Sequence, residues 1–192
     1  MTASEDFSHE YLEYLSSLIA KLDREAISKF ADLLLTARDT GSTTFFLGNG
    51  GSASTATHFV NDVSFGSRQF DKPFRAISLC DNQAVITAIA NDDGYENIFS
   101  QQLQTLAKAG DTIVCISASG NSKNLIKAIK YARENEIFVV GLTAFDGGYL
   151  KQNCDLNIHI PTKVGEYGPA EDLHMVVCGL MGSYFRKKFL NA

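Results

Sequence analysis

The chain has 192 residues, and 22 acidic side chains against 17 Lys and Arg give it a formal net charge of −5. This acidic balance lacks the electrostatic footprint of a nucleic-acid binder, so we expect no nucleic-acid partner. An apolar fraction of 45% predicts a folded domain with its own core. No apolar run approaches the roughly 18 residues of a membrane span. The polar, acidic start lacks the features of a secretory signal peptide, so we expect a cytoplasmic protein without a membrane partner.

Hydrophobic spacing predicts two helices within residues 1–40, followed by alternating strands and helices from 41 to 192. Strands are predicted at 43–47, 74–79, 112–116, 137–142 and 156–160. Helices are predicted at 52–65, 82–90, 94–108, 121–134 and 170–189, with a turn at Gly147-Gly148. The alternation indicates βαβ units. We therefore expect one α/β domain over 1–192, a three-layer αβα sandwich around a five-stranded parallel sheet, preceded by the helical pair.

Two of the predicted strand ends have the same chemical character. The segments Gly48–Ser52 and Ser117–Ser122 are small, hydroxyl-rich and glycine-containing, and each opens a helix. Ligands of parallel sheets bind beyond the carboxyl ends of the strands. Free N–H groups at a helix start and serine hydroxyls donate to anions, so the pair predicts a phosphate site without a basic residue. The alternative is a pair of tight turns in which Ser or Asn only caps a helix.

Two further groups of polar side chains lie on helices. His58 and Asp62 are four residues apart and share a helix face. This spacing suits a shared metal ion or a proton-transfer pair, and the alternative is an ordinary surface contact. Glu171, Asp172 and His174 begin the last helix, where acidic residues commonly complement the helix dipole. The rest of that helix is apolar, which predicts burial, and a buried His174 would need a hydrogen-bond partner.

The chain resembles the SIS (sugar isomerase) family of phosphosugar-binding domains, and within it the phosphoheptose isomerases. The likeness covers nearly the whole chain and implies a flavodoxin-like SIS fold. The segments that carry it are Gly48–Ala53, Ala90–Tyr95, Ser117–Ser122, Leu142–Gly148 and Glu171–His174.

The resemblance implies a homotetramer with active sites at subunit interfaces and a sugar phosphate as ligand. The implied substrate-binding residues are Asn49, Gly50, Gly51, Ser52, Asp92, Ser117, Ser119, Asn121 and Ser122, the serines on the phosphate and Asn49 and Asp92 on the sugar chain. The family holds a zinc ion with a His and a Glu on the helix after the first loop and a Gln and a His on the last helix. Carried over to this chain, it implies a divalent metal, zinc, on His58, Asp62 and Glu171, with Asp62 and Glu171 catalytic.

The chain departs from the family at its metal and acid–base positions. Asp62 is one methylene shorter than the family's Glu, Glu171 replaces the Gln, and Gly179 replaces the last His. A glycine side chain can neither bind metal nor move a proton. His174 lies five residues earlier, roughly 140° away around the helix. Cys178 lies nearer to the face of Glu171 and is a candidate soft ligand.

The resemblance implies a phosphosugar aldose–ketose isomerase of heptose biosynthesis. Its reaction would convert sedoheptulose 7-phosphate to glycero-manno-heptose 7-phosphate through an enediol, as an intramolecular oxidoreductase. The alternative is a non-catalytic SIS protein that binds a phosphosugar or associates with the replication initiator. Gly179 favours the alternative, whereas His58, Asp62 and Glu171 together favour the enzyme.

Overall fold

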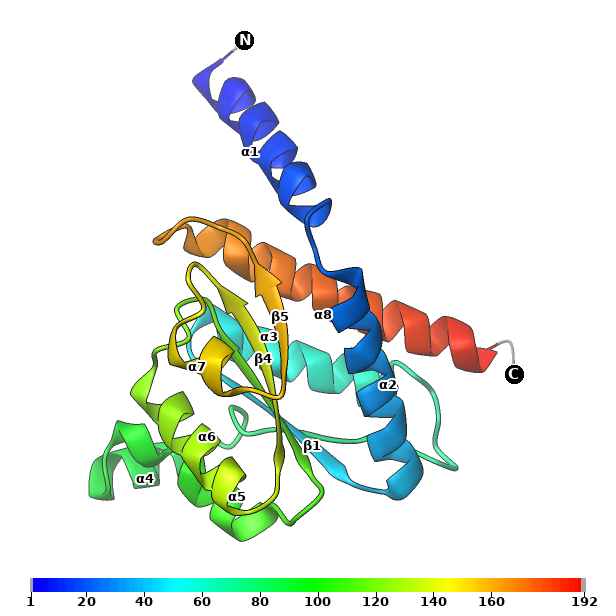
Figure 1. Cartoon of the computed structure of the whole chain (residues 1–192), viewed down its shortest axis with the longest axis vertical. Coiled ribbons are helices and arrows are strands. Elements are labelled where there is room, and N and C mark those ends of the chain that lie inside the picture. Colours follow the sequence, from blue (N-terminus) through cyan, green and yellow to red (C-terminus); the bar gives the residue numbers. More distant parts are fainter. Residues whose placement is uncertain (1, 191–192) are drawn as a thin grey trace.

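Figure 1 shows the chain as a computed structural model that describes residues 2–190, with helices on both faces of a central sheet. The strands are β1 (Thr43–Gly48), β2 (Arg75–Ser78), β3 (Thr112–Ser117), β4 (Phe138–Ala144) and β5 (Leu156–Ile160). The α-helices are α1 (Ala3–Ile19), α2 (Arg24–Thr40), α3 (Gly51–Val60), α4 (Gln83–Asp92), α5 (Ser100–Leu106), α6 (Lys123–Glu134), α7 (Gly148–Asn153) and α8 (Tyr167–Leu190). A π-helical turn, η1 (Asn61–Phe65), continues α3, and a 3₁₀ turn, η2 (Tyr95–Asn97), follows α4.

All five strands are parallel, and their order across the sheet is β2-β1-β3-β4-β5. Phe46 of β1 is paired with Ser78 of β2 on one side and with Val114 of β3 on the other. This arrangement confirms the predicted α/β fold with its five-stranded parallel sheet. The strand order reverses between β1 and β3, so the loops that follow these two strands flank the crevice where doubly wound sheets bind ligands.

Alternate side chains of the central strands enter two separate cores. Phe45 and Leu47 of β1 pack with α5, α6 and α7, whereas Phe46 packs on the opposite face with α2, α3 and α8. Phe59 anchors α3 in this second core, fully buried and stacked on Phe46 with 5.1 Å between ring centroids. Burying such a ring is worth about 1.5–3 kcal/mol. The core thereby holds α3 and α8 against the same face of the sheet.

The structure differs from the prediction at three helices. The predicted helix over 94–108 is divided and shorter, because its start forms the 3₁₀ turn η2 and α5 spans only Ser100–Leu106. The turn predicted at Gly147-Gly148 continues into α7, whose six residues are too few to show a helical period in the sequence. The helix after the first loop changes to π geometry at Asn61.

Helix α1 extends away from the rest of the molecule and contacts it near the start of α8 (Figure 1). The hydroxyl of Tyr11 donates to Asp172 Oδ2 at 2.6 Å, and that of Tyr14 donates to Glu166 Oε2 at 2.5 Å. Leu18 is buried at the base of the helix. Other apolar side chains of α1 are exposed, namely Phe7, Leu12 and Ile19. Neither this helix nor any other within residues 2–190 is long and apolar enough to cross a membrane.

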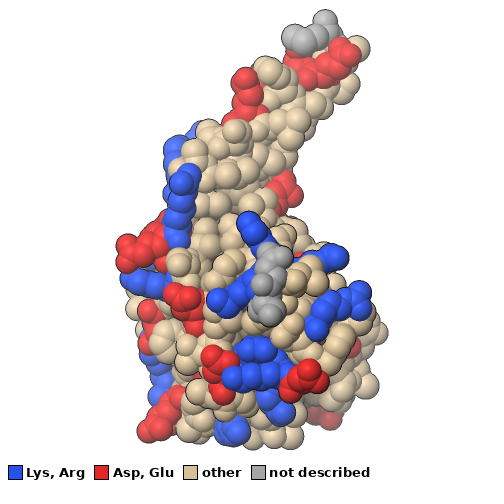
Figure 2. All heavy atoms as spheres, turned by 90° about the vertical axis from the view of Figure 1, so that its right-hand side faces the viewer, with Lys and Arg blue, Asp and Glu red and all other residues tan. Residues whose placement is uncertain are grey.

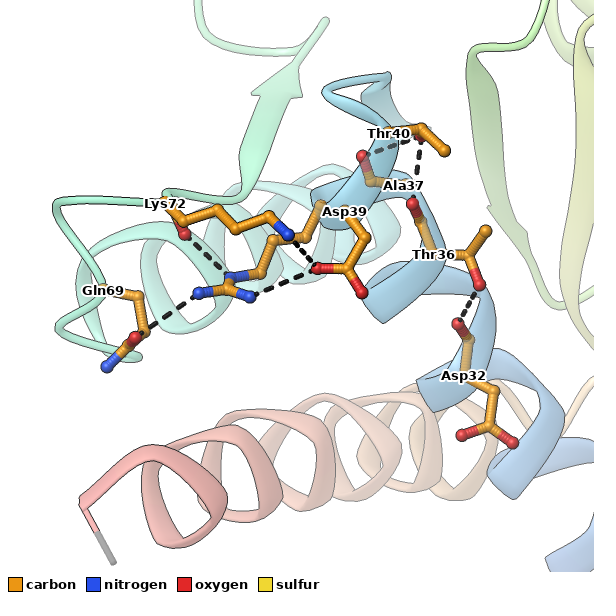
Figure 3. A network of polar contacts seen from close by, with 8 residues as sticks. Asp32, Thr36, Ala37, Asp39, Thr40, Gln69 and Lys72 are labelled. Carbon is orange, nitrogen blue, oxygen red and sulfur yellow. Dashed lines mark hydrogen bonds and ion pairs between the residues drawn. The ribbon is translucent and has the colours of Figure 1, made fainter. Parts of the chain in front are cut away.

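The segment between η1 and β2 is fastened to the end of α2 (Figure 3). Arg38 Nε donates to the carbonyl of Lys72 at 2.7 Å, and Arg38 Nη2 donates to Gln69 Oε1 at 3.4 Å. The ammonium group of Lys72 lies 2.5 Å from Asp39 Oδ1. The guanidinium carbon of Arg38 also lies 4.6 Å from the centroid of the Phe189 ring of α8. These contacts tie the chain that leaves η1 to α2, and Arg38 in turn joins α2 to α8.

Candidate functional site

The loop after β1 turns sharply into α3. Gly50 has a φ of +55°, in the left-handed region that favours glycine, and α3 begins at the next residue. The carbonyl of Asn49 accepts the N–H of Ser52 at 3.0 Å. A Cβ on Gly48 would lie 2.8 Å from Ser52 Cβ, so the turn can be this tight only without a side chain there. The turn places the start of α3 directly at the carboxyl end of β1.

The loop after β3 folds around its own hydroxyl groups. Ser117 Oγ accepts the N–H of Gly120 at 3.1 Å, and Ser119 Oγ accepts the N–H of Asn121 at 3.4 Å. Ser122 is the N-cap residue of α6, yet among the described residues its side chain makes no capping hydrogen bond. The Ser122 hydroxyl and the N–H groups of Lys123 and Asn124, the first two of α6, are therefore available to a ligand.

The backbone of Gly147 and Gly148 packs against the loop after β3. A Cβ on Gly120 would lie 2.7 Å from the backbone carbon of Gly147, so the two backbones touch. Asn121 Oδ1 accepts the N–H of Tyr149 at 2.9 Å. Asn121 thus uses one lone pair of its carbonyl oxygen to hold α7, and its amide nitrogen remains for a ligand.

A pair of amide side chains joins the two loops. Asn49 Nδ2 donates to Asn124 Oδ1 at 3.0 Å, and Asn124 Nδ2 donates back to Asn49 Oδ1 at 2.8 Å. Asn124 is buried on α6 and also accepts the N–H of Leu125 at 2.9 Å. The hydroxyl of Tyr95 donates to Asn49 Oδ1 at 2.9 Å. Both loops and η2 are therefore connected through the side chain of Asn49.

His58, Asp62 and Cys178 form a group with metal-ligating chemistry where α3 meets α8. His58 Nε2 lies 3.3 Å from Asp62 Oδ2, and one ligand atom from each of the three side chains lies within 4.8 Å of the others. The His58 side chain is 51% exposed, so the group opens to solvent on one side. Cys178 is fully buried, and this burial, with a smaller contribution from the Asp62 charge, raises the pKa of its thiol to about 12.

Asp62 owes its position to a π-helical turn and a glycine. The N–H of Gly66 bonds to the carbonyl of Asn61 at 2.9 Å, five residues earlier, and π turns of this kind often occur at functional sites. A Cβ on Gly182 of α8 would lie 2.9 Å from both Cβ and Oδ2 of Asp62. The carboxylate therefore occupies space that any other residue at position 182 would fill.

Glu171 lies at the opposite end of α3 from Asp62. A Cβ on Gly51 would lie 2.5 Å from the carboxyl carbon of Glu171, which places this carboxylate beside the first residue of α3. At 1.5 Å per residue, Gly51 and Asp62 are about 16 Å apart along the helix. Within one chain, His58 and Asp62 lie together on a helix face, as predicted. The third side chain beside them is Cys178, and Glu171 lies far from the group.

His174 is a buried core residue without the hydrogen-bond partner that we expected. Neither of its ring nitrogens makes a hydrogen bond to any residue from 2 to 190. Burial lowers the pKa of His174 to about 4, and the nearby Thr143 backbone only partly opposes this shift. His159 bonds to the Thr143 hydroxyl at 3.0 Å. His174 is thus held neutral inside the protein.

Asp92 lies exposed at the end of α4, where its carboxylate accepts a hydrogen bond from Asn91 at 2.7 Å. The sequence did not indicate three residues that contact the site. Tyr95 and Asn124 bond to Asn49 of the first loop, and Gly182 lies against Asp62. A signal for Tyr95 existed, since it belongs to the family-like segment Ala90–Tyr95. Nothing in the sequence pattern marks Gly182, because its role depends on which helix faces it.

Comparisons with known proteins show the family and the fold of the chain. The family described as the SIS domain matches residues 6–144. The phosphoheptose isomerase of Helicobacter hepaticus is 37% identical over 156 residues, which are 81% of this chain and 79% of that protein. The structures of phosphoheptose isomerases from Neisseria gonorrhoeae and Francisella tularensis align with TM-scores of 0.86 and 0.87 at 29% and 26% identity. Each alignment covers 97% of this chain and 100% of the other. These matches confirm the resemblance that the sequence motifs indicated.

Proposed function

The chain belongs to the SIS domain family, and we propose that it is a phosphoheptose isomerase of heptose biosynthesis. It interconverts sedoheptulose 7-phosphate and glycero-manno-heptose 7-phosphate, an intramolecular redox change. The observation that carries the proposal is its homology to phosphoheptose isomerases over most of its length. The hydroxyl-rich loops at the switch point of the sheet supply the chemistry that a sugar phosphate needs.

We place the phosphate group at the loop after β3. Ser119, Ser122 and the first N–H groups of α6 offer donors there, and each charge-assisted hydrogen bond is worth about 1.5–3 kcal/mol. The start of α3 is less suitable, because the carboxylate of Glu171 lies beside Gly51 and repels a phosphate dianion. The loop after β1, with Asn49 and Ser52, then contacts the sugar chain, as does Asp92.

The reaction needs groups that move protons at the first two carbons of the sugar. A base removes a proton from the carbon beside the carbonyl, an enediol forms, and the proton returns to the neighbouring carbon while the two oxygens exchange another. Asp62 is the carboxylate that we assign to the carbon, and Glu171 the one that we assign to the oxygens. Both groups must act at two neighbouring carbons, whereas about 16 Å separates them along α3. We therefore place the complete site between subunits, with the loops and Glu171 of one chain and Asp62 of a second copy.

The residues beside Asp62 fit a divalent metal ion, for which we propose zinc. Imidazole nitrogen, carboxylate oxygen and thiolate sulfur are the three usual zinc ligands, and His58, Asp62 and Cys178 offer one of each. The exposed side of His58 leaves room for a further ligand, as catalytic zinc sites require. When bound, such an ion supplies polarisation of the sugar carbonyl. Glu171 can join these ligands only from a neighbouring subunit.

Exposed apolar surface supports the homotetramer that this arrangement requires. In Figure 2, α1 is a projecting arm with a broad uncharged flank. The exposed apolar side chains of α1 and α8 include Phe7, Leu12, Ile19, Val176, Leu180 and Tyr184. Monomeric proteins seldom expose such a surface. Light scattering should give a tetramer, and a monomer at micromolar concentration would remove the shared site as well.

The decisive test of the function is turnover of sedoheptulose 7-phosphate by protein supplied with zinc, followed by NMR of the sugar. Asp62→Asn should lower the rate by about 10²–10⁴-fold, the usual contribution of a positioned acid–base group, while keeping the fold. Sugar-phosphate binding without turnover in the wild-type protein would instead support the non-catalytic SIS protein. Wild-type turnover that persists in Asp62→Asn would remove this residue from the mechanism.

The shared site has its own test, the mixing of two impaired variants assayed at a sedoheptulose 7-phosphate concentration well below KM. One carries Asp62→Asn, and the other carries Ser119→Ala with Ser122→Ala. Random mixing of subunits should restore about a quarter of the sites, since such a site draws its loops from one chain and its Asp62 from another. A site built within one chain would stay as impaired in every mixture as in the separate variants.

A further inference from the structure

We infer that Asn124 is a positioning residue that locks the side-chain amide of Asn49, so that Asn49 offers the sugar phosphate a single N–H donor. The inference rests on the proposed function, because it names how one residue of that site meets its ligand. It depends on the contacts between Asn49, Asn124, Tyr95 and Leu125, none of which involves the metal-ligating group.

The orientation of both amides follows from one backbone group. The N–H of Leu125 can only donate, so the Asn124 atom that it meets at 2.9 Å must be the carbonyl oxygen. The Asn124 nitrogen then faces Asn49 at 2.8 Å, and the Asn49 atom there must accept. A flipped Asn49 would set two nitrogens against each other. The backbone of α6 thereby determines which way Asn49 points its oxygen and its nitrogen.

The hydrogen bonds that Asn49 already makes determine what its side chain can still offer a ligand. Its Oδ1 accepts from both Asn124 and Tyr95, which uses both lone pairs of an amide oxygen. One of its two Nδ2 hydrogens bonds to Asn124. One N–H is left, and it can bind only an acceptor. Asn49 therefore recognises a hydroxyl, carbonyl or phosphate oxygen as a donor and cannot accept a hydrogen bond from the sugar.

Asn124 is suited to this role because its side chain is buried and hydrogen-bonded to the backbone of α6. It is 2% exposed and lies in the first turn of α6, directly after the loop that we assign to the phosphate. Tyr95 is 55% exposed and makes a single contact with Asn49, so it supports the amide from the solvent side. Asn124 should therefore matter more than Tyr95 for ligand binding.

The inference is tested by a double-mutant cycle on the affinity for sedoheptulose 7-phosphate, measured by calorimetry, with kcat and KM measured beside it. Asn124→Ala should weaken binding about tenfold, the value of one hydrogen bond of ordinary strength. In an Asn49→Ala background the same substitution should change the affinity by less than about twofold, because the amide that it positions is absent. Tyr95→Phe should have a smaller effect than Asn124→Ala.

Asn124→Asp is the second variant, in case alanine destabilises α6. It retains an oxygen for the N–H of Leu125 but loses the donor to Asn49. Any direct repulsion between the new charge and the phosphate would persist without the Asn49 side chain, whereas loss of positioning would not. The Asn49→Ala background therefore separates the two effects.

Each outcome decides one of the two proposals. Equal weakening with and without the Asn49 side chain would show that Asn124 acts on α6 itself and would overturn the inference, as would unchanged affinity in both Asn124 variants. Binding by the wild-type protein without turnover would refute the isomerase, while the affinities would still decide the role of Asn124. A wild-type protein that binds no sugar phosphate would overturn both.

Discussion

Gly182→Ala is the substitution that most directly tests the position of Asp62. The new Cβ would lie 2.9 Å from both Cβ and Oδ2 of Asp62, where ordinary contacts begin at about 3.4 Å. Asp62 belongs to a π-helical turn whose next residue, Val63, is buried in the core, so the backbone has little freedom to retreat. Gly179→Ala is the matched control on the same helix, because a Cβ at position 179 meets no described atom within 4 Å.

The two substitutions should have opposite effects on stability. Replacing a helical glycine by alanine stabilises a helix by about 0.5–1 kcal/mol, and Gly179→Ala should gain this amount. Gly182→Ala gains the same but also overpacks the contact with Asp62, which costs about 1–3 kcal/mol. The net change at position 182 should therefore range from about zero to a loss of 2.5 kcal/mol. The displaced carboxylate should also move away from His58.

Urea unfolding at fixed protein concentration measures the change in stability. Zinc affinity and turnover report the displacement of the Asp62 carboxylate. Gly182→Ala should reduce zinc affinity and turnover at least tenfold, whereas Gly179→Ala should leave zinc affinity unchanged. A Gly182→Ala protein that is stabilised as much as Gly179→Ala and binds zinc normally would refute the close contact between Asp62 and α8. The metal-ligating group would then need a different geometry.

Three further predictions concern other parts of the molecule. Ser119→Ala with Ser122→Ala should weaken the calorimetric affinity for sugar phosphate tenfold or more, since two donors to a charged group are lost; an unchanged affinity would place the phosphate elsewhere. Cys178→Ser should abolish the thiolate-to-metal absorption of the cobalt-loaded protein and lower zinc affinity by about tenfold or more; an identical cobalt spectrum would exclude Cys178 as a ligand. His174, whose pKa burial lowers from 6.5 to about 4, takes up its proton first in the unfolded chain as the pH falls. Stability should consequently drop by about 3 kcal/mol between pH 6.5 and 4, and urea unfolding of His174→Leu should lack this part of the pH dependence.

The fold could be predicted because its signals are local. Continuous apolar runs such as 112–116 and 137–142 indicate strands buried on both faces, and the structure has β3 and β4 there. Helix α7 escaped prediction because glycines precede it and its six residues carry no recognisable period. The break between η2 and α5 was missed because the apolar spacing of Ile98, Phe99 and Leu103 continues across it.

The candidate site was predictable only where one segment builds it alone. The two loops follow from strand ends, glycines and serines within a few residues of each other, as does the His58–Asp62 pair. The amide pair of Asn49 and Asn124 joins residues 75 positions apart, and no local pattern indicates it. Its formation depends on β1 and β3 being neighbours, which the sequence does not state.

The contacts between α3 and α8 explain why Cys178 joins His58 and Asp62 and why position 179 does not face them. Gly51 touches Glu171, His58 lies near Cys178, and Asp62 touches Gly182, so the helices run side by side in the same direction at a constant offset. Cys178 and Gly182 are four residues apart and share the α8 face that meets α3. Position 179 lies outside this contact, since a Cβ there meets no described atom of the same chain. A side chain at this position would therefore start outside the contact with α3, which agrees with the site between two subunits that we propose.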